Sequence, residues 1–177
     1  PLLRGLVPLC IVLMFSACAS VPLGTMLRFS TFDEEDFAAI DPQQLSVRIF
    51  LADPQAIGEG PVFLNLLLET SGQPFIGNYQ MAPSRSFRDE QSSGWFGPAV
   101  TGTTYQFELT PAQVLEFRRL QQEMLNTAVE HMTISVNFPP LTTDPEEARV
   151  WVFLALDDKR DYITLVDGAR VQIDYDQ

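Results

Sequence analysis

The sequence predicts a mainly β domain, sandwich-like and antiparallel, with one inserted amphipathic helix. An α+β layer in which the helix covers one sheet is the alternative. Three observations predict this class. Several short segments have apolar residues at every second position, and Gly- and Pro-rich turns separate these segments. One further segment has a helix cap and helical spacing of its apolar residues. The 177 residues are 46% hydrophobic and 19% charged, which suits one globular domain, placed at residues 25–177.

The first half of that domain is expected to hold four strands and a short helix. Residues 25–31 alternate in part, and the acidic segment after them is typical of a helix start. Residues 45–52 read LSVRIFLA, which places every second residue on one apolar face. Residues 62–69 are apolar on both faces except at Asn65, which indicates a central strand, and a further strand is expected at 75–81.

Residues 92–103 are expected to form a long loop, because glycine, proline and serine are concentrated there. The loop carries two adjacent aromatic residues, Trp95 and Phe96. Two interpretations of this pair stay open: the rings anchor a bound ligand, or they pack into the edge of the core.

The clearest local signal is a helix start at Thr110. Thr at the cap, Pro111 at the first helical position and Gln113 two residues later form a capping box. The helix is expected to reach about residue 127 after a strand at 105–109, and its apolar stripe indicates core packing.

The last third of the chain is expected to form a meander. Residues 132–138 alternate, and residues 150–156 are apolar on both faces, as in a buried central strand. Asp167-Gly168 is typical of a two-residue hairpin turn, which would pair residues 161–166 with residues 169–173.

The N-terminal residues 1–17 have the pattern of a secretory signal peptide. Arg4 supplies a positive charge, and an uncharged apolar stretch at 5–15 follows it. That stretch is shorter than the roughly 20 apolar residues that a membrane-spanning helix needs.

The end of this leader, Phe15-Ser16-Ala17-Cys18, resembles the lipobox of bacterial lipoproteins, although Phe15 stands where that family prefers leucine. The resemblance implies cleavage between Ala17 and Cys18, fatty acylation of Cys18 with chains such as palmitate, and a lipidated tether at 18–24. Several acyl chains give stable anchoring. Two alternatives stay open: cleavage before Ser20, which releases a soluble protein, or an uncleaved anchor. Because neither Ala19 nor Ser20 is aspartate, the resemblance favours the outer membrane, facing the periplasm.

The segments TMLRFSTFD, LSVRIFLAD and YQFELTPAQVLEFRRLQ, followed by the C-terminal meander, resemble short proteobacterial lipoproteins to which no activity is attached. The segment LSVRIFLAD alone is similar to the sandwich lipoprotein of type VI secretion systems. These resemblances imply an envelope location and a β-rich body.

Charge and residue types limit the possible functions. A net charge of −12 argues against a nucleic-acid partner, and membrane attachment is expected to come from the lipid. Cys10 and Cys18 are the only cysteines, and His131 is the only histidine, so no catalytic set, metal site or cofactor is expected. We expect a non-enzymatic envelope lipoprotein with a protein partner; small-ligand or glycan binding through the 92–103 loop is the alternative.

Overall fold

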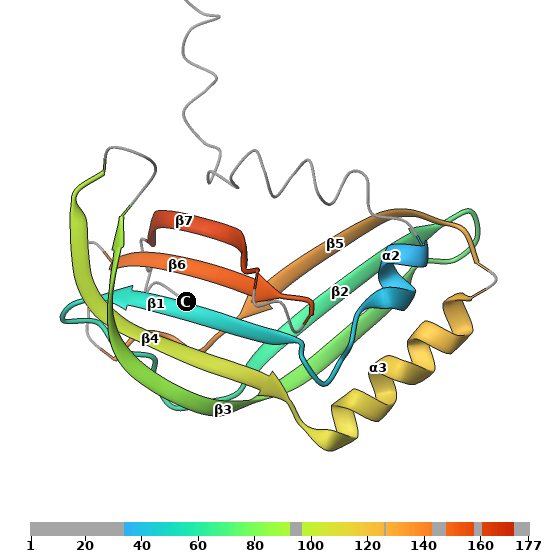
Figure 1. Cartoon of the computed structure of the whole chain (residues 1–177), viewed down its shortest axis with the longest axis horizontal. Coiled ribbons are helices and arrows are strands. Elements are labelled where there is room, and N and C mark those ends of the chain that lie inside the picture. Colours follow the sequence, from blue (N-terminus) through green and yellow to red (C-terminus); the bar gives the residue numbers. More distant parts are fainter. Residues whose placement is uncertain (1–33, 93–96, 126, 143–147, 158–160, 172–177) are drawn as a thin grey trace, which may run out of the picture.

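Seven antiparallel strands form one continuous, curled sheet, accompanied by two helices (Figure 1). The structure is a computed structural model, and it describes residues 34–92, 97–125, 127–142, 148–157 and 161–171. The strand order is β5-β2-β3-β4-β1-β6-β7. The elements are α2 (Glu34–Ala39), β1 (Ser46–Ala52), β2 (Val62–Thr70), β3 (Phe75–Ser92), β4 (Ala99–Leu109), α3 (Pro111–Met124), β5 (Val129–Asn137), β6 (Ala148–Ala155) and β7 (Ile163–Val171).

The predicted class, mainly antiparallel β with an inserted helix, is confirmed. The strands form a single curled sheet in place of two separate packed sheets. Because side chains alternate between the faces of a strand, residues at alternate positions in each of the seven strands contribute to one apolar core. The two helices and the residue after α2 add Phe37, Ile40, Val114, Phe117 and Met124 to that core. The expected strand at 25–31 lies outside the described residues.

The central strands β1 and β6 are buried on both faces. Val47, Ile49 and Leu51 of β1 belong to the main core. On the opposite face, Phe50 packs edge-on against Trp151 of β6, with ring centroids 5.1 Å apart. This second apolar cluster explains why residues 150–156 are apolar at consecutive positions, as expected of a central strand.

The predicted loop at 92–103 is wrong, because β3 continues to Ser92 and β4 begins at Ala99. All of β4 pairs with the second part of β3, from Met81 opposite Leu109 to Ser92 opposite Ala99. This end of the sheet is held by backbone hydrogen bonds and carries polar side chains, so apolar periodicity does not reveal it. Gly102 is required by close packing: a Cβ there would overlap the Leu51 carbonyl oxygen and lie 2.6 Å from Cζ of Phe50.

The predicted hairpin turn at Asp167-Gly168 is also wrong. Residues on both sides of it belong to the single strand β7, which pairs with β6. Val150 lies opposite Ala169 and Val152 opposite Val166, so β7 holds one extra residue here. Gly168 has φ 63°, which a bulge and a hairpin turn both accept. The Asp167-Gly168 pair is therefore compatible with either a bulge or a hairpin turn. Residues on both sides of the pair form hydrogen bonds with the long apolar strand β6 and not with each other.

Helix α3 begins at the predicted position, but only one half of the predicted capping box forms, because Gln113 Oε1 has no hydrogen-bond partner among the described residues. The Thr110 side chain accepts a hydrogen bond from the Gln113 backbone N–H at 3.3 Å, and Pro111 occupies the first turn. Replacing Thr110 with alanine is expected to lower the free energy of unfolding by about 1 kcal/mol, because this N–H loses its acceptor. Urea denaturation measures the loss. Thr110→Ser, which keeps the hydroxyl, is the control; equal losses in both variants would contradict this role of the cap.

Tyr79 of β3 is buried beneath α3, and its ring centroid lies 5.2 Å from that of Phe117. Burial, followed by the nearby Glu116 and Glu123 carboxylates, raises the pKa of Tyr79 to about 12. The folded state therefore holds this proton more tightly than the unfolded state does, where the pKa is about 10.

The stability that comes from protonated Tyr79 is expected to be complete below pH of about 10 and to be lost as the pH rises toward 12. Urea unfolding of the wild type and of Tyr79→Phe across this range tests the prediction. The wild type should lose more stability than the variant over the window. A constant difference between the two proteins would show that Tyr79 titrates normally.

Candidate functional site

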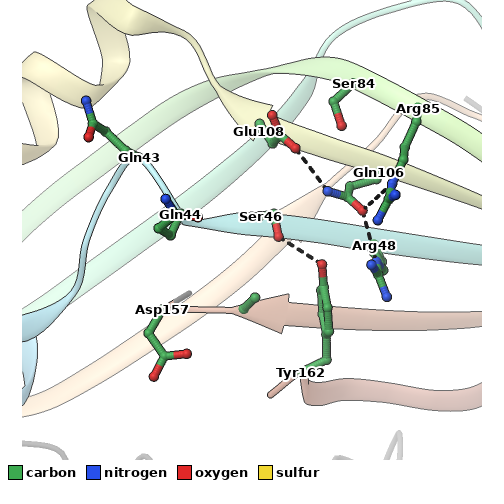
Figure 2. Close-up of a pocket in the computed structure, with 11 residues that line it drawn as sticks. Gln43, Gln44, Ser46, Arg48, Ser84, Arg85, Gln106, Glu108, Asp157 and Tyr162 are labelled. Atoms are coloured by element: carbon green, nitrogen blue, oxygen red, sulfur yellow. Dashed lines mark hydrogen bonds between the residues drawn. The ribbon is translucent and has the colours of Figure 1, made fainter. Parts of the chain in front are cut away.

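A polar cleft of about 420 Å³ lies on the sheet face opposite the main core (Figure 2). Strands β1, β3 and β4 form its floor, and residues next to β1, β6 and β7 form its walls. The lining residues are Gln43, Gln44, Ser46, Arg48, Ser84, Arg85, Gln106, Glu108, Ala155, Asp157 and Tyr162.

The sheet register brings two arginines to the same glutamine. Gln106 of β4 lies opposite Arg48 of β1 on one side and opposite Arg85 of β3 on the other. Paired residues of neighbouring strands point to the same face, so the three side chains form one row across the floor. The next row, Phe87, Thr104, Phe50 and Trp151, contains the second apolar cluster and bounds the cleft.

Hydrogen bonds hold the row of Arg48, Gln106 and Arg85 in place. Arg48 Nε donates to Gln106 Oε1 at 3.1 Å, and Arg85 Nε donates to the same oxygen at 3.0 Å. Gln106 Nε2 in turn donates to Glu108 Oε1 at 3.0 Å (Figure 2). Gln106 is buried, and its amide is oriented with the oxygen toward the two cations. Both guanidinium groups thus donate to Gln106 through Nε, and among the described residues their Nη groups donate no hydrogen bond.

Aromatic rings fix the plane of the Arg48 guanidinium. Its Cζ atom lies 4.0 Å from the ring centroid of Tyr162 and 5.7 Å from that of Phe87. The Tyr162 hydroxyl is hydrogen-bonded to Ser46 Oγ at 3.1 Å, which holds the ring. Arg85 lies 5.3 Å from the Phe87 ring. Stacked arginines lose less conformational entropy when they bind, so the pair is preorganised.

Neither Arg48 nor Arg85 forms an ion pair within the part of the chain that the structure describes. The contrast is Arg88, whose Nη1 and Nη2 both donate to the Asp53 carboxylate. That hydrogen bond lowers the pKa of Asp53. A guanidinium with outward Nη groups binds a carboxylate end-on through two parallel hydrogen bonds. The cleft is therefore built to accept an oxyanion, and a carboxylate matches the planar fork of each arginine.

None of the described residues that line the cleft was singled out as a candidate site from the sequence. Ala17 and Cys18, with the leader and tether, and the pair Trp95 and Phe96 all fall outside the described residues. The structure does place the ends of the connection that carries Trp95 and Phe96, at Ser92 and Ala99. His131 is exposed on the edge strand β5, opposite Glu69.

Among the described residues, no group of three or more His, Cys, Asp or Glu side chains is arranged to hold a metal ion. Within the same ranges, no helix has the length and apolar character needed to cross a membrane. Comparison with protein-family models, with curated proteins and with solved structures found no match.

Proposed function

We propose that this chain is a non-enzymatic envelope lipoprotein, anchored to the outer membrane through acylated Cys18, whose folded domain binds a protein partner. The Ser16-Ala17-Cys18 motif supports the anchor. The observation that carries the binding role is the arginine pair, Arg48 and Arg85, which both donate from Nε to Gln106 and whose Nη groups donate no hydrogen bond to another described residue. The partner contributes a carboxylate group to this cleft.

Electrostatics explain why such a cleft gives specificity. The protein carries a net charge of −12, so an acidic partner is repelled by most of its surface. Within a cleft that Glu108 and Asp157 also line, the guanidinium groups of Arg48 and Arg85 are the positions where a carboxylate can dock. Each charge-assisted hydrogen bond contributes about 1.5–3 kcal/mol when its partner is desolvated, so the pair fixes where and how the partner docks.

Photo-cross-linking in living cells tests this role. A photoreactive residue at Gln43, which is exposed and lines the cleft, is expected to capture one discrete partner. Replacing Arg48 and Arg85 together with alanine should abolish that product. Arg119→Ala, an exposed arginine on α3, is the matched control and should leave the product unchanged. Recovery of uncomplexed monomer alone, or an undiminished product in the double variant, would overturn the proposal.

A second candidate, small-ligand or glycan binding, is favoured by the cleft volume of about 420 Å³. This volume falls in the usual range for small-ligand sites, about 300–1,000 Å³. The hypothesis drawn from the sequence is that Trp95 and Phe96 contact the ligand. Replacing both with alanine should then weaken ligand affinity, and an unchanged affinity would remove these two residues from the site.

A further inference from the structure

Glu108 lies beside the two arginines of the cleft and is separated from them by one amide. It is two residues from Gln106 on β4, so both side chains point to the same face. Its Oε1 accepts a hydrogen bond from Gln106 Nε2 at 3.0 Å. Glu108 is exposed and forms no ion pair with any cation in the described ranges. The cleft lining thus presents two carboxylates, of Glu108 and of Asp157, as well as two guanidinium groups, and Asp157 has an interaction of its own.

Gln106 acts as a spacer between these unlike charges. Its oxygen accepts from both arginine Nε atoms, while its NH₂ group donates to Glu108. Because the amide occupies the position between them, the arginines and Glu108 do not neutralise one another directly. Two residues along a strand span about 7 Å, which is the backbone spacing of Gln106 and Glu108, and the amide of Gln106 separates the positive groups from the negative one.

We infer that the group bound in this cleft is zwitterionic, with a carboxylate on Arg48 and Arg85 and an ammonium on Glu108. This inference rests on the proposed binding role. A dianion of the same size would bring its second negative charge against Glu108, and a simple cation would meet the two arginines. A ligand with one charge of each sign satisfies both the arginine pair and Glu108. The same pair of charges occurs on a peptide segment of a partner or on a free small molecule.

The test uses the full-length protein purified in detergent, with two probes that differ by one charged group. Pentanoate carries the carboxylate alone, and 5-aminopentanoate adds an ammonium at the other end of the chain. Side-chain nitrogen NMR signals of Arg48 and Arg85 report binding of either probe. We expect 5-aminopentanoate to bind about tenfold more tightly than pentanoate, because it gains one charge-assisted contact.

Two variants assign the contacts. Glu108→Gln should remove the preference for 5-aminopentanoate while pentanoate still binds, whereas Arg48→Ala should abolish binding of both probes. Glu116→Gln, an exposed glutamate on α3, is the matched control and should keep the full preference. Adding 5-aminopentanoate during cross-linking separates the two sources: loss of the cross-linked product identifies the charge pair as the partner's own.

The outcomes separate this inference from the proposed function. Saturable binding of both probes with equal affinity, or a preference that survives Glu108→Gln, overturns the zwitterion and leaves a carboxylate site standing. No saturable shift with either probe overturns the carboxylate site itself.

Discussion

Replacing Phe117 with alanine is expected to lower the free energy of unfolding by about 3–5 kcal/mol, the range for removing a buried aromatic ring. Phe117 is 2% exposed, and its ring lies between those of Phe37 and Tyr79, at centroid distances of 5.5 and 5.2 Å. It therefore joins α2, α3 and β3. Alanine would leave a cavity where these three elements meet.

The contacts around Phe117 limit how far the cavity can close. Gln121, one turn later on α3, donates from Nε2 to the backbone oxygens of Phe37 and Ile40 at 2.9 and 2.8 Å. These bonds hold α2 in place. Urea denaturation measures the loss, with Leu115→Ala on the same helix as the control. Leu115 is 65% exposed, so its replacement should change stability by no more than about 0.5 kcal/mol. Similar losses in both variants would contradict this packing.

Replacing Cys18 with alanine is expected to move the protein from the membrane fraction entirely into other fractions, or to leave it as an unprocessed precursor. The proposed tether depends on acyl chains carried by this one residue, because several acyl chains give stable anchoring. Cell fractionation and mass spectrometry of the mature N-terminus measure the effect.

Cys10→Ala provides the matched control for the anchor, because Cys10 lies within the expected leader and is removed with it. That variant should be acylated and anchored like the wild type. A wild-type N-terminus at Ser20, an unmodified Cys18 sulfur, or a cleaved Cys18→Ala protein that stays in the membrane would each contradict the proposed tether.

The fold could be predicted from sequence where local chemistry has a single outcome. Thr110, Pro111 and Gln113 specify the start of α3 within three positions, and alternation in β1 sets its buried face. Asp167-Gly168 failed as a predictor because a positive φ serves a bulge as well as a turn. The β3–β4 end was missed because backbone pairing there carries polar side chains, for which apolar periodicity gives no signal.

The candidate site could not be predicted from local sequence patterns, because the sheet brings together residues that are far apart in the chain. Arg85 and Gln106 are 21 residues apart, and Arg48 and Gln106 are 58 apart. Only the strand order, β3-β4-β1, brings them together. One signal was present in the sequence: Arg48 interrupts the otherwise apolar LSVRIFLA strand, and a charge within a buried strand requires a polar partner.

A crystal structure of the protein with pentanoate shows whether Arg48 and Arg85 together receive a carboxylate. We expect the carboxylate oxygens within hydrogen-bond distance of the Nη atoms of both arginines, with Gln106 still accepting from each Nε. Arginines turned onto carboxylates of their own chain, with pentanoate absent from the cleft, would contradict it.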